Sequence, residues 1–256
     1  MTGRQRVFRF SALLLAALVL LPLLASGVSV ATQEQKHWSA TRWDSTGLAP
    51  APDAEPAAVV QVYAARLWGW RGAFAVHTWI VTKAAGADHY TRYEVVRWSS
   101  PVLRISRRTP DGHWAGNPPE LLRDLRGPQA AALIPQIAAL AETYPERGGY
   151  TIWPGPNSNS FTAHIARELP ELGLQLPPTA IGKDWIGRDR LLAPAPSGTG
   201  WQVSLFGLAG VTAAAREGLE LNLLGLTIGL DILQPALKLP GLGRIGRPAA
   251  VRETAG

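Results

Sequence analysis

His77-Thr-Trp-Ile-Val-Thr-Lys83 and the later stretch Asn157-Ser158-Asn159-Ser160-Phe161 decide how the fold of this chain is interpreted. The first is rich in β-branched and aromatic residues and predicts a strand. The second follows two prolines and begins with residues that favour a helix N-cap. A strand histidine and a hydroxyl at a helix N-terminus are the two parts of a base–nucleophile pair. Whether His77 and Ser158 can form such a pair depends on whether this strand and this helix pack together in the fold.

The segments around His77 predict an antiparallel meander. Residues 59–63 are rich in β-branched side chains, and residues 90–98 and 102–106 follow a turn at 86–88. Residues 119–124 are interpreted as a short helical turn. The strand predictions favour one sheet that carries His77.

Two longer helices are predicted after these strands. One begins at Gly127-Pro128, and Pro135 inside it predicts a kink or a late start. The other begins near Ser158 and ends before Pro170. Each has an apolar stripe that must pack on another element: Leu133, Ile137, Leu140 and Tyr144 in the first, and Phe161, Ile165 and Leu169 in the second.

The C-terminal third alternates between apolar and polar residues with period two. This pattern covers 201–205 and 219–223, and its phase slips by one residue over 224–232, as a β-bulge or strand break produces. Glu217, Glu220 and Asp231 argue against a second membrane span, because charges in hydrocarbon are costly. We therefore expect additional C-terminal β strands, which can still face lipid.

Composition excludes several kinds of site. The 256 residues include no Cys, so disulfides, thiolate catalysis and Cys-ligated zinc are absent. The net charge of +6 comes partly from arginines near the two termini, with no basic stripe interleaved with aromatics, so no nucleic-acid partner is expected. The histidines lack metal-ligand spacing, and no phosphate-binding glycine loop is present, so no metal and no cofactor are expected.

The N-terminal segment predicts an export signal or a membrane anchor. Arg4, Arg6 and Arg9 precede an uncharged apolar run over 10–31, long enough to span a bilayer. Its length favours an uncleaved anchor over a signal peptide, although small residues before Thr32 offer cleavage sites. The positive-inside rule places residues 1–9 in the cytoplasm and everything after residue 31 across the membrane. We expect a linker over 32–56, one α+β domain over 57–246 and a flexible tail over 247–256.

Two interpretations of the Ser158 region stay open. In one, Ser158 is a nucleophile activated by His77, with His89 or Glu94 orienting the imidazole. The N-terminus of the helix, with Asn157 and Asn159, then holds an oxyanion or positions a ligand. In the other, Asn157-Ser158-Asn159 is only a helix cap and His77 is structural.

Asn157-Ser158-Asn159-Ser160-Phe161-Thr162 resembles the Asn-Cys-X-X-Phe helix start of the circularly permuted papain-like group. That group includes NlpC-type hydrolases and lecithin:retinol acyltransferase-like proteins, and its histidine strand precedes its nucleophile helix, as here. The resemblance implies a permuted papain-like fold with an antiparallel sheet on helices, in which Ser158 replaces the cysteine and His89 resembles the second polar residue of some members.

A longer resemblance is to the bacterial domain-of-unknown-function family three-seven-five-zero, from about Val59 to Gly246. It is carried by Arg66-Leu-Trp-Gly-Trp-Arg71, Trp153-Pro-Gly-Pro-Asn-Ser-Asn159, Pro177-Pro-Thr-Ala-Ile-Gly-Lys-Asp184 and Leu205-Phe-Gly207. This resemblance implies no activity.

Three functions follow from these patterns. The first is a pseudoenzyme or ligand-binding module, anchored in the bacterial inner membrane with its domain on the periplasmic side, that binds an envelope peptide or acyl ligand. The second is an active Ser158 hydrolase or acyltransferase acting on envelope substrates. The third is a purely structural envelope protein. The lack of cysteine favours the first and third, whereas the two histidines favour the first and second.

Overall fold

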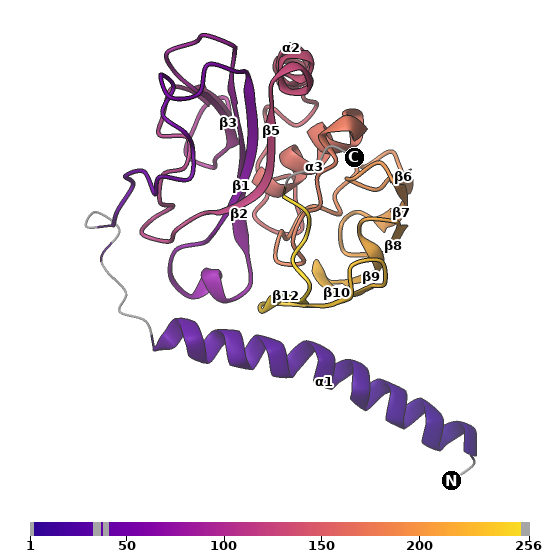
Figure 1. The fold of residues 1–256 in the computed structure, drawn as a ribbon. Coiled ribbons are helices and arrows are strands. Elements are labelled where there is room, and N and C mark those ends of the chain that lie inside the picture. Colours follow the sequence, from indigo (N-terminus) through magenta and orange to yellow (C-terminus); the bar gives the residue numbers. More distant parts are fainter. Residues whose placement is uncertain (1–2, 33–36, 38–40, 252–256) are drawn as a thin grey trace.

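A computed structural model describes residues 3–32, 37 and 41–251. It shows an α+β domain with two antiparallel sheets and one long N-terminal helix, α1 (Gly3–Ala31), beside the domain (Figure 1). The two sheets are formed by different parts of the chain, the first before residue 127 and the second after residue 191. Two helices, α2 and α3, lie between them in the sequence.

The first sheet has five strands in the order β4-β3-β2-β1-β5. Its strands are β1 (Val59–Arg66), β2 (Val76–Lys83), β3 (Thr91–Val95), β4 (Leu103–Ser106) and β5 (Glu120–Arg126). The first four strands confirm the predicted meander, because each pairs antiparallel with the next along the chain. A short 3-10 helix, η2 (Gly69–Ala73), connects β1 to β2.

The interpretation of residues 119–124 as a helical turn is wrong. Residues 120–124 belong to β5, which pairs antiparallel with β1 through Val60 opposite Leu125 and Gln61 opposite Asp124. The local pattern of charged and apolar residues fits both a helical turn and a strand, and pairing with β1 selects the strand.

Helices α2 (Pro128–Glu142) and α3 (Ser158–Glu168) cover one face of this sheet. Phe161 and Ile165 of α3 are fully buried beside Val62 and Ile80 of the sheet. Helix α3 contacts β2 and β3. The prediction that the Ser158 helix packs on the sheet that carries His77 is therefore confirmed.

Loops cover the other face of the first sheet. Trp43 packs edge-on against Trp114 with 5.6 Å between ring centroids. Asp111 accepts hydrogen bonds from Ser45 Oγ at 2.8 Å and from the backbone of Leu48 at 2.6 Å. Residues 41–56, predicted as part of a linker, thus pack on the domain, and this face is buried as well. Residues 33–36 and 38–40 of the predicted linker lie outside the described residues.

The second sheet has seven strands in sequential order, β12 to β6. They are β6 (Leu192–Pro194), β7 (Gly200–Leu205), β8 (Ala209–Ala214), β9 (Gly218–Leu223), β10 (Leu226–Asp231), β11 (Ala236–Leu239) and β12 (Gly243–Gly246). The phase slip after Leu223 is a strand break, since β9 and β10 form a hairpin whose turn is Leu224-Gly225. The expectation of additional C-terminal strands is confirmed.

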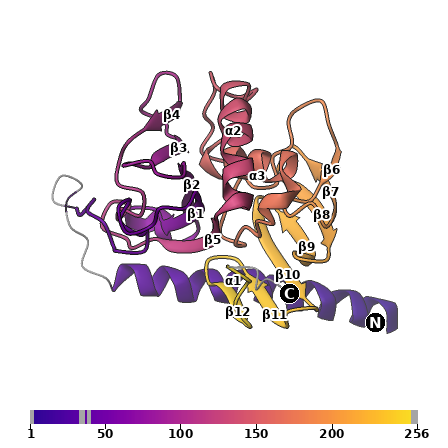
Figure 2. The same cartoon turned by 45° about the horizontal axis from the view of Figure 1, so that its top comes forward.

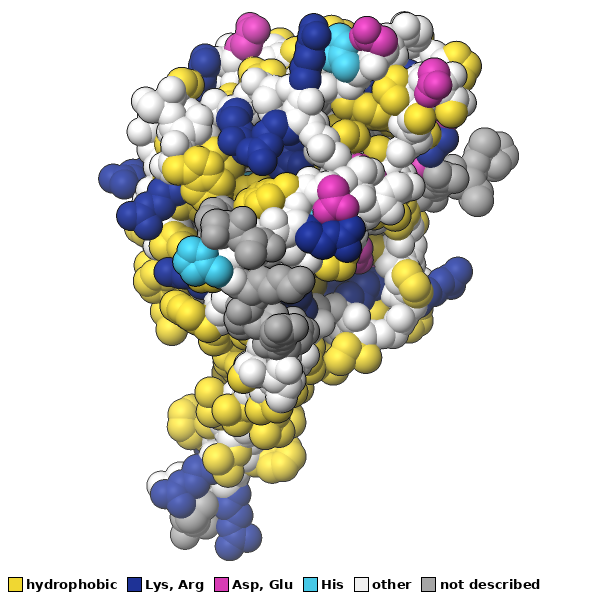
Figure 3. Space-filling view, turned by 90° about the vertical axis from the view of Figure 1, so that its left-hand side faces the viewer, with side chains coloured by type: hydrophobic (Ala, Val, Ile, Leu, Met, Phe, Trp, Pro, Cys, Tyr) yellow, Lys and Arg dark blue, Asp and Glu magenta, His cyan; other side chains and the backbone are white. Residues whose placement is uncertain are grey.

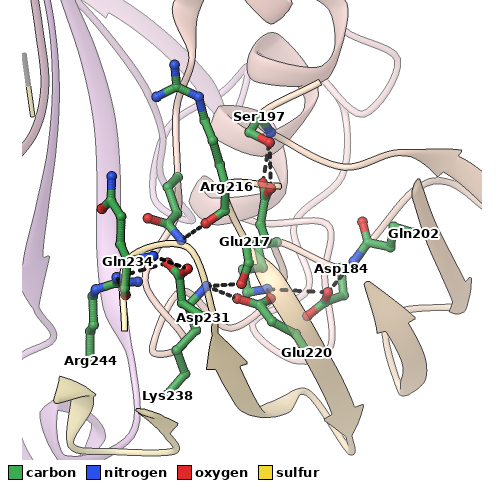
Figure 4. Close-up of polar contacts among 12 residues, drawn as sticks. Asp184, Ser197, Gln202, Arg216, Glu217, Glu220, Asp231, Gln234, Lys238 and Arg244 are labelled. Atoms are coloured by element: carbon green, nitrogen blue, oxygen red, sulfur yellow. Dashed lines mark hydrogen bonds and ion pairs between the residues drawn. The ribbon is translucent and has the colours of Figure 1, made fainter. Parts of the chain in front are cut away.

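The inward face of this second sheet is polar (Figure 4). Glu220 lies between two buried lysines, with both Lys183 Nζ and Lys238 Nζ at 2.5 Å from its carboxylate oxygens. Glu217 accepts a 2.8 Å hydrogen bond from the backbone of Ser197. Each of these charges has a partner of opposite sign or a hydrogen bond, as buried charges require.

Among the described residues, α1 is the one helix long and apolar enough to cross a membrane. It contacts η2, β10 and β11, and its Ser26 hydroxyl donates to the carbonyl of Ala73 at 2.7 Å. Figure 1 shows α1 below β10 and β12, Figure 2 shows it passing behind β11 and β12, and Figure 3 shows apolar side chains along its projecting part. The domain is therefore attached to the C-terminal part of a helix that is able to span a bilayer.

Candidate functional site

The N-terminus of α3 is closed by its own capping box. Asn157 Oδ1 accepts hydrogen bonds from the backbone N–H groups of Asn159 at 2.9 Å and Ser160 at 3.3 Å. In return, Ser160 Oγ accepts from the backbone N–H of Asn157 at 2.7 Å. These amides belong to the first turn, where an oxyanion would be held, and the cap already uses them.

The side-chain amides of Asn157 and Asn159 connect three parts of the chain. Asn157 Nδ2 donates to the carbonyls of Ile152 at 3.2 Å and Ile181 at 3.1 Å. Asn159 Nδ2 donates to the carbonyls of Val76 at 3.0 Å and Ile181 at 2.7 Å. The predicted oxyanion or ligand-positioning residues thus hold the start of α3 against β2 and the loop at 181.

Thr78, rather than His77, faces the start of α3. The Thr78 hydroxyl lies 3.2 Å from the carbonyl oxygen of Ser158 and 2.9 Å from Thr162 Oγ1. Successive side chains of a strand point to opposite faces of the sheet, so His77 points away from α3. The structure does not bring the Ser158 hydroxyl and the His77 imidazole together.

His77 is buried in an aromatic layer on the far face of the first sheet. Its ring stacks on Trp114 with 3.6 Å between centroids, and Trp79 lies beside both rings, 5.7 Å from His77 and 6.3 Å from Trp114. His77 Nε2 lies 3.2 Å from Glu94 Oε2. Burial lowers the pKa of His77 despite the raising effect of Glu94, so the ring is neutral near neutral pH and Nε2–H donates to the carboxylate.

Glu94 is the centre of a buried ion cluster. Arg92 donates to Glu94 Oε2 at 2.8 Å, and Arg104 donates to Oε1. Burial alone would raise the pKa of Glu94. The hydrogen bond from His77 and the two guanidinium charges lower the pKa by more than burial raises it, so it lies below the ordinary value. Glu94 therefore contacts the imidazole, as its predicted orienting role requires, and also pairs with Arg92 and Arg104.

His89 does not take part in this cluster. It lies in the turn between β2 and β3, where its Nδ1 is 2.5 Å from Asp88 Oδ1, and its side chain is 37% exposed. Of the two residues predicted to orient the His77 imidazole, Glu94 contacts it and His89 lies near the surface. Among the described residues, no group of His, Asp and Glu is placed to hold a metal ion.

A groove with a volume of about 290 Å³ opens at the start of α3. We call it the α3 groove. Its described lining includes Asn157, Ser158 and Asn159 at the base, Arg71 as the one charged residue, and apolar walls from Leu67, Trp70, Phe74, Val76, Tyr150, Ile152, Trp153 and Ile181. Ser158 thus lies in a cleft, but in an apolar one whose described lining does not include His77.

Exposed apolar side chains surround the groove. Trp70 is 66% exposed, with Arg71 5.0 Å above its ring, and Trp153 is 47% exposed. Trp153 Nε1 donates to the carbonyl of Leu224 at 2.8 Å, which attaches the β9–β10 turn to the groove. Sequence reasoning missed Thr78 and this apolar rim. Residues 76–83 of β2 are all buried and do not alternate between polar and apolar types, so no local pattern assigns Thr78 to the α3 side, and none joins Trp70 to Trp153.

Comparisons with known proteins agree with one of the two resemblances. A family model described as "Protein of unknown function (DUF3750)" matches residues 57–185. The match covers half of the chain and ends before the second sheet, so it does not include Leu205-Phe-Gly207. No curated protein and no solved structure matches the chain significantly.

Proposed function

The chain belongs to the DUF3750 family, whose function is unknown, and from this premise we propose that it is a membrane-anchored binding domain. Its ligand, in this proposal, is an acyl chain with an anionic head, held in the α3 groove. The observation that carries the proposal is the lining of the groove, which is apolar except for the asparagines and serine at its base and one cation, Arg71. An apolar pocket with a few polar groups is the usual form of a small-ligand site.

The position of the groove supports a ligand of membrane origin. Trp70 and Arg71 belong to η2, and η2 also packs against α1. The Ser26–Ala73 hydrogen bond fixes this contact near the C-terminal end of α1. A lipid leaving the bilayer beside α1 would therefore meet the exposed Trp70 first. Aromatic side chains of this kind are favoured at membrane interfaces.

The same geometry favours binding over catalysis. A serine hydroxyl stays protonated until an aligned base removes its proton, and His77 points to the other face of the sheet. The cap also uses first-turn amides that would stabilise an oxyanion. We propose a degenerate papain-like site, in which the helix start keeps its place against the sheet while the base is missing.

Topology is part of the proposal. Arg4, Arg6 and Arg9 precede the apolar part of α1, so the positive-inside rule places the domain on the periplasmic side of a bacterial inner membrane. A reporter that is active only outside the cytoplasm, fused after Gly256, should be active. An active cytoplasmic reporter at the same position would refute this topology.

Binding is tested with the full chain in detergent and with cis-parinaric acid, a fluorescent anionic acyl probe. Arg71→Ala should weaken binding by about 10- to 150-fold, because a charge-assisted contact contributes about 1.5–3 kcal/mol. Ser158→Trp should abolish binding by filling the groove. Arg107→Ala removes an exposed arginine of the first sheet's edge and is the matched control. Equal affinity for the wild type and Ser158→Trp would refute the site.

Ser158→Cys tests the enzymatic alternative, since the new thiol is the only one in the chain. Without an imidazole beside it, the thiol should react with iodoacetamide at about the rate of a free thiol, with at most a modest gain from the helix N-terminus. A rate enhanced by orders of magnitude would show a preorganised base and favour the hydrolase.

A further inference from the structure

The second sheet is inverted relative to an ordinary half-buried sheet. Its covered face carries the charged cluster of Figure 4, whereas its open face carries large apolar side chains. We call this open face the outer sheet face. Trp201 is 60% exposed, Leu219 56% and Leu230 53%. The other large members are Val203, Leu205, Val211, Leu221, Leu237 and Ile245.

Cross-strand pairing makes the outer sheet face continuous. Val203 of β7 lies opposite Val211 of β8, which lies opposite Leu221 of β9, which lies opposite Ile228 of β10. A second row begins at Trp201 and passes through Leu219 to Leu230. Apolar rows on adjacent strands form one surface, and a surface of this extent on a folded domain marks an interaction site.

We infer that the outer sheet face rests on the lipid bilayer that α1 crosses. The outward positions of β6–β12, all of which the structure describes, carry no charged side chain. A protein partner would normally meet a polar rim with charges interleaved, whereas hydrocarbon favours a face without them. The charges of this sheet are instead placed on the covered face, where Glu220 and Lys238 pair with each other.

Continuity with α1 identifies the occupant as lipid. Helix α1 packs on β10 and β11, and its Ser26 hydroxyl lies 3.2 Å from the carbonyl of Gly241. Figures 1 and 2 both show β6–β9 toward the same end of the molecule as the N-terminus of α1. The bilayer crossed by α1 therefore lies on the side of the second sheet, and the apolar surface of the helix continues onto β10 and β11.

The hairpin tips add an independent observation. Phe206 in the β7–β8 turn has φ of 52°, and Leu224 in the β9–β10 turn has φ of 53°. This left-handed region favours Asn or Gly in tight hairpin turns and costs other residues about 1–2 kcal/mol. Both side chains are exposed, Leu224 at 64%. Large apolar residues at strained, exposed positions are consistent with insertion into lipid, because burial of the side chain in lipid would offset the conformational free energy of the left-handed backbone.

Because the chain has no cysteine, single-cysteine variants place one probe at a chosen site. We would attach an environment-sensitive nitrobenzoxadiazole label to Val203→Cys or Leu221→Cys in the full chain. The protein would be reconstituted in nanodiscs of phosphatidylcholine and phosphatidylglycerol, with or without doxyl-labelled lipid. Gln136→Cys, exposed on α2 at the far side of the domain, is the control.

The expected result at Val203 and Leu221 is a blue-shifted emission, quenching by doxyl lipid several-fold stronger than at Gln136, and several-fold weaker quenching by iodide. Strong iodide quenching at both positions would show a face in water and overturn the inference. Protection from iodide without doxyl quenching would show contact with a second copy or another protein, which also overturns it. Arg71→Ala should leave these signals unchanged, so failure of the α3 groove proposal is distinguishable.

Discussion

The two sheets of this protein use apolar residues in opposite ways. The first sheet is covered by α2 and α3 on one side and by loops on the other, and large apolar side chains fill both faces. The second sheet is covered on one side, and that side is the polar one. The difference shows that strand patterning alone does not tell whether a row of apolar side chains lies in the core or on an open face, because this depends on what covers each face of the sheet. It also coincides with the family boundary, since the match to DUF3750 ends before β6.

Both sheets nevertheless contain a buried glutamate held by two cations. Glu94 lies between Arg92 and Arg104, and Glu220 lies between Lys183 and Lys238. Replacing either carboxylate leaves two cations without their main partner, all of them buried except the partly exposed Arg104. The two clusters differ in their other neighbours, and this difference allows the sheets to be separated by experiment.

The largest expected effect is the loss of either central glutamate. Glu94→Gln and Glu220→Gln should each lower the free energy of unfolding by about 3–5 kcal/mol, because breaking a buried ion pair strands the remaining charges. Chemical denaturation of the full chain in detergent measures this. Glu171→Gln on the surface should change the value by less than about 0.5 kcal/mol. A small effect of Glu220→Gln would mean that the second sheet does not depend on its charged face.

Acid should weaken the first sheet before the second. The pKa values of Glu94 and His77 both lie below their ordinary values of 4.5 and 6.5. The unfolded chain therefore binds protons more readily, and stability is lost as pH falls, first below the ordinary His value. In the second sheet the lowered pKa of Glu220 is opposed by raised pKa values of Glu217 and Asp184, which act with the opposite sign.

Hydrogen exchange resolved by segment, corrected for intrinsic rates, measures this difference between about pH 7 and about pH 5. Protection of β2 and β3 should fall more than protection of β9 and β10. His77→Phe keeps a ring against Trp114 but removes the titrating group, so it should reduce the difference. An equal loss in both sheets would contradict the assigned causes.

A smaller effect is expected at the α3 cap. Asn157→Ala should cost about 2 kcal/mol, at the upper end of N-cap losses, because its side chain also ties down Ile152 and Ile181. Ser158→Ala should cost less, since the contact of Ser158 with Thr78 runs through its carbonyl oxygen, which alanine keeps. Thermal unfolding of the two variants gives the comparison. The reverse order would make the Ser158 hydroxyl the more important group.

The smallest expected effect concerns the β9–β10 tip. Leu224→Asn should raise the free energy of unfolding in detergent by about 1 kcal/mol, because asparagine tolerates the left-handed conformation better. The same change should weaken doxyl-lipid quenching of a neighbouring probe at Leu221→Cys. A stability gain without loss of lipid contact would indicate that the tip does not insert.

Much of the fold follows from local sequence patterns. β-Branched and aromatic composition predicts the strands of the first sheet, and period-two alternation predicts those of the second. Four-residue spacing of Phe161 and Ile165 predicts an α3 stripe that packs on the sheet. The residues at 157–159 favour a helix cap, and the structure contains one at Asn157. β5 was mistaken for a helical turn, because its state depends on pairing with β1, which no local pattern records.

The candidate site was predicted less well, for a related reason. Residue types and element order suggested a pair between His77 and Ser158, but a single step along a strand turns a side chain to the opposite face. Thr78 thus faces α3 and His77 faces Trp114. Choosing between these faces requires the phase of β2 relative to its covering layer, which is set by contacts with residues far away in sequence.

The sequence by itself determined the absence of thiol chemistry, the apolar N-terminal helix, the mixture of strands and helices, and the alternation of the C-terminal strands. Only the tertiary structure decided that Glu94 rather than His89 orients His77, that Arg71 and Trp153 line one groove, and that the second sheet keeps its charges inside. The physical reason is that local sequence fixes backbone propensity and periodicity, whereas burial and pairing of each side chain depend on which distant segment covers it.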